Sequence, residues 1–183
     1  PSRKLLKDTC KVASTFGAKG VIVHGGSVGE GGDISAGYDN WRKALEHVED
    51  TGMKVLVENT AGGKNSVARY MNSIERLWEV IGHLNVGLCL DTCHTWAGGI
   101  PTIDAVKGFK KLVKKIDLIH FNDSKDGFES SRDRHENLGK GKIPKEELEY
   151  VIKNAKTDII VETPNGPDAQ KKDIAWIKRR LKK

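Results

Sequence analysis

The sequence predicts an α/β fold built on a parallel sheet. Two observations predict it: five short apolar runs rich in β-branched residues, and amphipathic stretches between them whose apolar residues recur every three or four positions. With 37% hydrophobic and 31% charged residues among 183, the chain can bury a core, which argues against disorder or a disulfide-stapled miniprotein. We expect one domain over residues 1–183, because no linker or low-complexity tract interrupts the pattern.

The apolar runs are too short for helices, and we expect them to be strands buried on both faces. They cover residues 20–23, 54–57, 86–90, 117–119 and 158–161. The amphipathic stretches predict helices near residues 3–16, 38–50, 67–81, 106–116, 144–154 and 168–181. Strict alternation gives parallel strands with right-handed crossovers, so the sheet is either open and doubly wound or part of a (β/α)8 barrel. A full barrel needs eight strands and roughly 200 residues or more.

Composition and charge narrow the classes of function. A formal net charge of +6 permits a polyanionic partner such as nucleic acid, although basic residues near the C-terminus are equally typical of a solvated helix end. No apolar run approaches the roughly 18 residues of a membrane-spanning helix, and the first residues lack a secretory signal. Cys10, Cys89 and Cys93 fit reduced thiols better than disulfides, and Cys89 and Cys93, in a strand-like run, are expected to be buried. We therefore expect a cytoplasmic protein with no membrane partner.

A potential metal ligand follows every predicted strand. The five residues are His24, Glu58, Asp91, His120 and Glu162. Asp and Glu together number 25 and His six in 183 residues, so chance does not readily place one at all five strand ends. The carboxyl ends of parallel strands share one face in either architecture, so these side chains should converge. Cations would neutralise such a crowded set, and the mixture of imidazole and carboxylate suits zinc or manganese.

Three further candidates flank these five. His94 lies three residues after Asp91, on the loop that enters the next helix. Asp133 and His135 lie two residues apart in a polar loop, where an extended backbone would point both the same way. Each alone has an ordinary explanation, as a helix-start residue, a turn residue or a loop hydrogen bonder. Together with the strand-end set, we interpret all three as ligands.

Other residues receive weaker predictions. His47 and His83 lie in helical stretches and are expected at the surface or in packing. Three tryptophans on apolar helical faces are expected in the core: Trp41, Trp78 and Trp176. Trp96 is equally consistent with the core and with the site. Five polar residues near the predicted site are candidates for phosphate contacts and equally for turn or solvated residues: Asn122, Ser124, Lys125, Lys140 and Lys142.

The motifs around these residues resemble the endonuclease IV family of abasic-site endonucleases. They read Val-His24-Gly-Gly-Ser27, Val-Glu58-Asn-Thr-Ala-Gly62, Cys-Leu-Asp91-Thr-Cys-His94, His120-Phe-Asn-Asp-Ser124, Asp133-Arg-His135-Glu-Asn-Leu-Gly139 and Glu162-Thr-Pro164. The resemblance spans nearly the whole chain, and Asp-Thr-Cys-His followed by Asp-Arg-His-x-x-Leu-Gly is highly specific. It implies a TIM (β/α)8 barrel, of which this chain would form the C-terminal portion, with five strands visible and the first three lacking.

The resemblance also implies an activity and a set of metal sites. The activity is that of a zinc-dependent phosphodiesterase of DNA repair, which cuts double-stranded DNA on the 5′ side of an abasic site. The implied cofactors are up to three Zn²⁺ ions, with Mn²⁺ as an alternative at one site. Glu58 and Glu162 would be the catalytic carboxylates.

The resemblance further assigns each ligand to an ion. Glu58 would bridge two ions, with His24 on one and Asp91, His120 and Glu162 on the other. The third ion would be held by His94, Asp133 and His135. Family members supply one more zinc-binding His from a strand upstream of the one that ends at His24. The ion at His24 would therefore have one protein ligand fewer here, and a full-length member is expected to be a monomer.

Two alternatives stay open. Sugar isomerases and epimerases of the same barrel class also place Glu, Asp and His at strand ends, but around one or two metals, so the additional ligands favour the nuclease. Alternatively, the chain is truncated or degenerate and binds zinc or DNA without cutting, or it needs another polypeptide to complete the barrel. The lack of three strands would leave two open sheet edges, which favour aggregation unless they are covered. Incubation with an abasic-site duplex and, separately, with ketoses would separate these functions.

Overall fold

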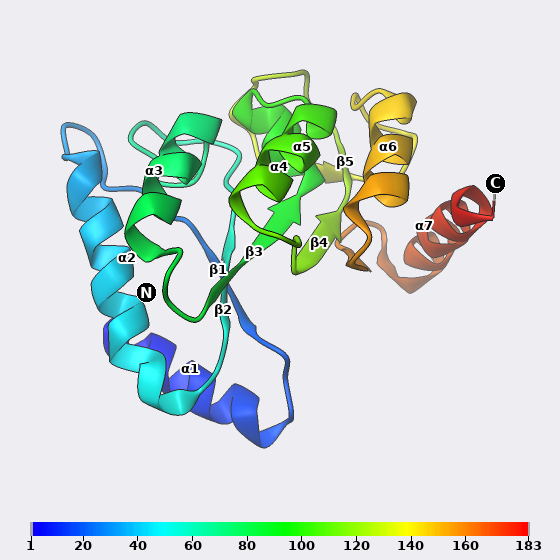
Figure 1. Cartoon of the computed structure of the whole chain (residues 1–183). Helices are drawn as coiled ribbons and strands as arrows, with labels where there is room; N and C mark the ends of the chain where they lie inside the picture. Colours follow the sequence, from blue (N-terminus) through cyan, green and yellow to red (C-terminus); the bar gives the residue numbers. More distant parts are fainter. Residues whose placement is uncertain (1, 183) are drawn as a thin grey trace.

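The computed structural model describes residues 2–182 and contains a five-stranded parallel sheet flanked by helices (Figure 1). The strands of this sheet are β1 (Val21–His24), β2 (Val55–Glu58), β3 (Val86–Asp91), β4 (Leu118–Phe121) and β7 (Asp158–Val161). The helices are α1 (Arg3–Thr15), α2 (Ile34–Val48), the 3-10 turn η1 (Glu49–Thr51), α3 (Met71–Ile81), α4 (Thr92–Gly98), α5 (Thr102–Leu112), α6 (Lys145–Ala155) and α7 (Gly166–Leu181). A short antiparallel ribbon joins β5 (Asp123–Ser124) to β6 (His135–Glu136).

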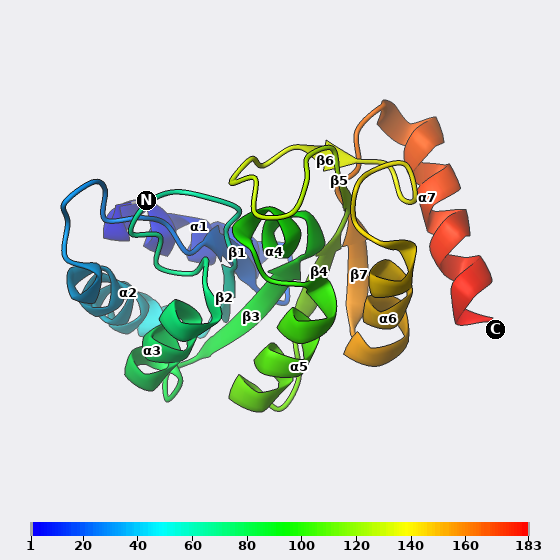
Figure 2. The same cartoon turned by 90° about the horizontal axis from the view of Figure 1, so that it is seen from above.

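The winding of the sheet decides between the two predicted architectures. Its strands follow one another in chain order, β1-β2-β3-β4-β7, and every pairing is parallel. Figure 2 shows α2, α3, α5 and α6 in a row along one side of the curved sheet, with α7 beyond α6. A doubly wound sheet would reverse its strand order and carry helices on both faces. The prediction of a parallel α/β fold is confirmed, and the winding is that of a (β/α)8 barrel.

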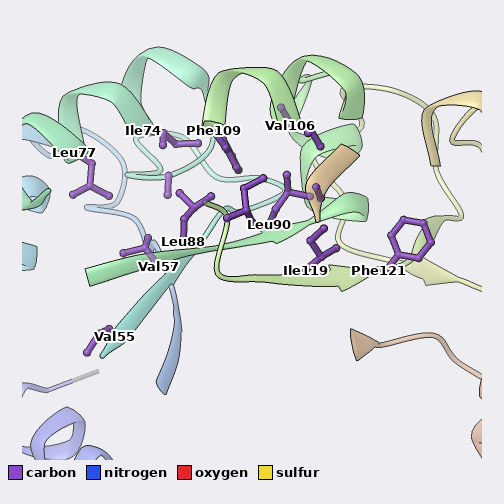
Figure 3. Packing of buried hydrophobic residues seen from close by; sticks show 14 of the residues in the cluster. Val55, Val57, Ile74, Leu77, Leu88, Leu90, Val106, Phe109, Ile119 and Phe121 are labelled. Atoms are coloured by element: carbon purple, nitrogen blue, oxygen red, sulfur yellow. The ribbon is translucent and has the colours of Figure 1, made fainter. Parts of the chain in front are cut away.

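One face of the sheet forms the hydrophobic core with the helices. Side chains alternate between the two faces of a strand, so every second residue packs under a helix. Figure 3 shows this layer, in which Val57, Leu88, Leu90 and Ile119 of the strands lie beneath α3 and α5, whose residues Ile74, Leu77, Val106 and Phe109 face them, with Val55 and Phe121 toward its two ends. Each fully buried side chain of this size contributes about 1.5–3 kcal/mol to folding. This layer holds the strands, and with them the strand ends, in place.

The alternate residues project from the opposite face. The candidate ligands His24, Glu58 and His120 each lie two residues beyond an apolar residue of that face, such as Leu56 before Glu58. β1 and β7 are the outer strands of this sheet, and Ile160 in β7 is 48% exposed. The prediction that every strand is buried on both faces is therefore wrong for β1 and β7, because each has a sheet neighbour on one side only among the described residues.

Several element boundaries differ from the prediction for local reasons. Helix α2 begins at Ile34 rather than residue 38, because the Asp33 side chain accepts a hydrogen bond from the Ser35 backbone N–H (2.9 Å). Residues 67–70 are loop rather than helix, since Val67 donates its N–H to the carbonyl of Gly26 (2.9 Å). Residues 113–116 also lie outside a helix, and the predicted helix begins earlier, at Thr102.

The remaining sequence predictions concern burial. Trp41 is buried, and its indole N–H donates to the carbonyl of Gly25 (2.8 Å), while Trp78 and Trp176 are partly buried against the core. All three cysteines are free, and the burial predicted for Cys89 and Cys93 is confirmed; Cys10 is buried as well. His47 and His83 are exposed. Within residues 2–182, we find no helix with the length and apolar character that a membrane crossing requires.

Candidate metal centre

The structure brings all eight predicted ligands together at the carboxyl ends of the strands. His24, Glu58 and Asp91 are the last residues of β1, β2 and β3. His120 is the penultimate residue of β4, and Glu162 directly follows β7. Three more come from the connecting segments: His94 from α4, Asp133 from the loop after β5, and His135 from β6. Residues separated by more than a hundred positions thus share one neighbourhood.

Glu58 occupies the middle of this cluster. Its Oε1 lies 2.9 Å from Nδ1 of His120 and 3.5 Å from Nδ1 of His94, and its Oε2 lies 3.4 Å from Nε2 of His24. Glu162 meets the same Nδ1 of His120 at 3.1 Å. The Glu58 carboxylate is 4% exposed, so its negative charge is compensated by these imidazoles rather than by bulk water. A buried carboxylate with both oxygens turned toward different imidazoles is suited to bridging two cations.

Asp133 lies between the imidazoles of His94 and His135. Its Oδ2 lies 3.0 Å from Nε2 of His94, and its Oδ1 lies 3.2 Å from Nε2 of His135. These contacts with His135 and His94 hold the pKa of Asp133 well below its usual value, although burial opposes the shift. The thiol of Cys93, which sequence reasoning treated as inert, lies within 4.8 Å of ligand atoms of Asp133 and His135.

The imidazoles of His94 and His135 are each oriented so that Nε2 can bind a metal ion. Nδ1 of His94 lies 2.9 Å from the carbonyl of Asn59, and Nδ1 of His135 lies 2.8 Å from the carbonyl of Glu162. A carbonyl only accepts, so Nδ1 donates in both, and Nε2 is left for another partner. Both Nε2 atoms are buried, and although an Asp133 oxygen lies within 3.2 Å of each, the angles give neither a well-formed hydrogen bond within residues 2–182. Buried polar atoms rarely lack a partner, so this pair fits a metal ion.

Neighbouring groups raise the pKa of two buried imidazoles, those of His94 and His120. Burial opposes a charge on His94, but the carboxylates around it, led by Asp91, outweigh burial and raise the pKa of His94 to about 9. Burial also opposes a charge on His120, and hydrogen bonds with Cys89 and Glu162 help to raise its pKa to about 12. These contacts favour the protonated form of both imidazoles. A metal ion would replace those protons, because imidazole binds metal in its neutral form.

Asp91 is fixed at the junction of β3 and α4. Its Oδ1 accepts a hydrogen bond from the backbone N–H of His94 (2.7 Å) and so caps α4, and its Oδ2 accepts one from the side-chain amide of Asn122 (2.6 Å). The amide of Asn59 pairs with both the N–H (2.8 Å) and the carbonyl (3.1 Å) of Asp91. Sequence reasoning missed both supports, although each Asn lies within two residues of a predicted ligand.

Three sequence predictions about the surroundings of the cluster need correction. His94 lies within α4 rather than on a loop, and the Asp-x-x-His spacing is the signature of the helix cap. Asn122 and Ser124 are wrong as phosphate contacts, because both are fully buried and their side chains bond to internal groups. Trp96, which the sequence left open between core and site, packs against the core and donates its indole N–H to the carbonyl of Asp126 (3.2 Å).

A cleft of about 400 Å³ opens beside the cluster. The ligands on its wall are His24, His94 and Asp133, and most of its remaining wall comes from small residues of the loops after β1 and β2, including Gly62 and Gly63. His24 is 62% exposed and Asp133 is 53% exposed, so the cluster is accessible from this side. The arrangement offers a cleft walled by small residues next to a set of metal ligands.

The comparison with known proteins agrees with this fold. The family model described as "Xylose isomerase-like TIM barrel" matches residues 1–180. The fold and the cluster therefore define a barrel of this class with candidate metal ligands at its strand ends. The probable endonuclease 4 of Mycobacterium tuberculosis (strain ATCC 25177 / H37Ra) is 48% identical over 180 residues, which are 98% of this chain and 70% of the relative. This chain belongs to the endonuclease IV family.

Solved structures give the same assignment. The crystal structure of endonuclease IV from Thermus thermophilus matches with a TM-score of 0.79 and 29% identity, over 99% of this chain and 68% of that one. A D-tagatose 3-epimerase-like protein matches with a TM-score of 0.76 over 98% of this chain and 68% of that one. At 19% identity the second match shows the fold alone.

Proposed function

We propose that this chain carries the active site of a DNA repair endonuclease that hydrolyses the phosphodiester 5′ to an abasic site with up to three zinc ions. The observation that carries the proposal is the single network of eight His, Asp and Glu side chains, in which two buried imidazole nitrogens face Asp133 without a well-formed hydrogen bond within residues 2–182. The family membership supplies the reaction, since relatives at 48% identity are described as probable endonuclease 4.

Three groups of residues would hold the ions. One group lies with its ligand atoms all within 4.8 Å of one another: Glu58, Asp91, His120 and Glu162. A second would use His24 and share Glu58, whose two oxygens face different partners. The third would use His94, Asp133 and His135, in which Asp133 contacts both imidazoles. Bound divalent metal would stabilise charge on a phosphate and lower the pKa of water, as two-metal phosphodiesterases require.

The protein's own side chains would orient the reaction. Glu58 is buried and contacts three imidazoles, so we assign it the role of the central carboxylate. Glu162 is 40% exposed, and its hydrogen bond with His120 holds its pKa below the usual value, although burial opposes the shift. It therefore presents an ionised carboxylate at the edge of the cluster, where the substrate phosphate would approach.

The substrate preference would come from the cleft. An abasic nucleotide costs less unstacking energy to extrude from a duplex than a normal one does. A cleft walled by Gly62, Gly63, Ser27 and Ser66 has room for a sugar and phosphate beside His24. Exposed Lys125, Lys140 and Lys142 remain candidates for backbone phosphate contacts.

Metal analysis combined with a cleavage assay tests this function. The 183-residue chain would be loaded with Zn²⁺, dialysed, analysed for zinc, and incubated with a duplex that contains one abasic site. We expect two or three zinc ions per chain and nicking on the 5′ side of the lesion, with no cutting of the matched undamaged duplex. Zinc without nicking would leave a metal-binding chain without this activity, and turnover of a ketose instead would assign the chain to the isomerases.

A further inference from the structure

We propose that Asn122 is a positioning residue that fixes Asp91 and the end of β7 in the orientation that the metal cluster needs. This inference rests on the proposed function, because it concerns how the chain prepares its ligands. Asn122 follows His120 by two residues and is fully buried. It is not itself one of the eight candidate ligands.

The two ends of the Asn122 amide bond to two different strand ends. Its Nδ2 donates to Oδ2 of Asp91 (2.6 Å), and Asp91 is the last residue of β3. Its Oδ1 accepts from the backbone N–H of Glu162 (3.0 Å), which follows β7. A single planar side chain on the segment after β4 therefore ties together the carboxyl ends of β3, β4 and β7. Asp91 and Glu162 both belong to the four-residue candidate metal group.

The main chain of Asn122 is itself held in place. Its backbone N–H donates to Oγ1 of Thr92 (2.8 Å), and the same hydroxyl donates to the carbonyl of Asn122 (2.6 Å). Thr92 is the residue after Asp91, so the loop after β4 is attached to the start of α4 at two points. The amide consequently approaches Asp91 from a fixed direction.

The geometry restricts how Asp91 can bind an ion. Oδ1 of Asp91 is engaged by the N–H of His94 and Oδ2 by Asn122, which leaves one lone pair on each oxygen. A carboxylate held at both oxygens cannot rotate, so its free lone pairs have fixed directions. Removal of a hydrogen-bond partner that orients a metal ligand typically lowers the metal affinity by about 10–100-fold.

The test removes the hydrogen-bond donor Nδ2 of Asn122 while keeping the shape of its side chain. In Asn122→Asp, an oxygen stands where Nδ2 was, so the acceptor for the Glu162 N–H is retained while Asp91 faces a second carboxylate. Asn137→Asp is a matched control, because the Asn137 amide also donates to a buried carboxylate, that of Asp173 (2.7 Å), and Asp173 is not one of the eight candidate ligands. Asn122→Ser is the second variant, for use if Asn122→Asp does not fold.

Each protein would be titrated with Co²⁺ below its melting temperature, and the visible absorption bands would report both affinity and coordination. We expect Asn122→Asp to weaken binding by roughly 10–100-fold and to change the band intensities, whereas Asn137→Asp, although destabilised, binds as the unmodified chain does. Equal Co²⁺ affinity and spectra for Asn122→Asp and the unmodified chain would overturn the positioning role. Equal weakening in both variants would overturn it as well, because general destabilisation would then explain the loss. A chain that binds no Co²⁺ at all overturns the proposed function first.

Discussion

At the scale of single residues, hydrogen bonds decide which atoms of the cluster are free. The Nδ1 atoms of His94 and His135 donate to backbone carbonyls, so both rings direct Nε2 toward Asp133. The sequence pattern predicted which residue types would converge, because strand ends in a parallel sheet share a face. It did not predict Asn59 and Asn122 as supports, because amide partners depend on rotamers and register that a single sequence does not specify.

Glu58 is the residue whose replacement separates binding from cleavage. Glu58→Gln keeps the volume and the burial but removes the central negative charge, so the nicking rate is expected to fall by roughly a thousand-fold or more. Binding to an abasic-site duplex, measured by fluorescence anisotropy, should change little, because Glu58 is nearly inaccessible. His83→Gln serves as a control at an exposed histidine and should cleave normally. Undiminished turnover by Glu58→Gln would refute its central role.

The three thiols should be unreactive in the folded protein. All three are buried, and burial raises the pKa of Cys93 to about 12. At pH 8 the thiolate of Cys93 would then be roughly one part in ten thousand, and only the thiolate reacts quickly with disulfide reagents. We expect no fast reaction with Ellman's reagent in native buffer and three reactive thiols in denaturant. A rapid native reaction of even one thiol would show that the burial is wrong.

At the scale of elements, the segment between β4 and α6 departs most from the sequence prediction. It was expected to be a polar loop, but it contains the β5–β6 ribbon, which places His135 opposite Ser124. Buried Asp123 accepts hydrogen bonds from the backbone N–H groups of Gly139, Gly141 and Ile143 (3.0, 3.0 and 3.1 Å). Two-residue strands and backbone nests leave no hydrophobic period in a sequence, so the pattern could not reveal them.

Gly141 is required by this segment. A Cβ at position 141 would collide with the Asp123 carboxylate and with the carbonyl of Ser124. Gly141→Ala is therefore expected to destabilise the protein by about 1–3 kcal/mol, as measured by urea unfolding. Gly127→Ala is the matched control in the same segment, since a Cβ there meets nothing within 4 Å; we expect a change within about 0.5 kcal/mol. Similar effects of the two substitutions would contradict the close packing at Gly141.

At the scale of the whole molecule, the parallel sheet and the core were predictable, because the five apolar runs and the amphipathic stretches carry clear periods. Residues alone left the winding of the sheet open, and the structure decided it through the unbroken strand order β1-β2-β3-β4-β7. Burial of the outer strands was predicted wrongly, since a local pattern does not show how many neighbours a strand has. The candidate metal centre takes ligands from the carboxyl ends of all five strands, so ions bound there would link these strands to one another.

Metal removal should therefore lower the stability of the entire chain. An ion present at a thousand times its dissociation constant stabilises the native state by about 4 kcal/mol, which for a chain of this size corresponds to a melting temperature higher by roughly 8–16 °C. We expect EDTA to lower the melting temperature of the zinc-loaded protein by on the order of 10 °C, and added zinc to restore it. The Glu58→Gln variant should respond less. A melting temperature that changes with neither EDTA nor added zinc would contradict a metal centre whose ligands come from all five strands.

The position of bound ions is the most direct test of the account. Crystals of the zinc-loaded chain, measured above and below the zinc absorption edge, would show each ion as an anomalous difference peak. We predict a peak between Glu58, Asp91, His120 and Glu162, and another between His94, Asp133 and His135. Peaks confined to other parts of the surface, or none at the strand ends in zinc-loaded crystals, would contradict the claim that these side chains form a metal centre.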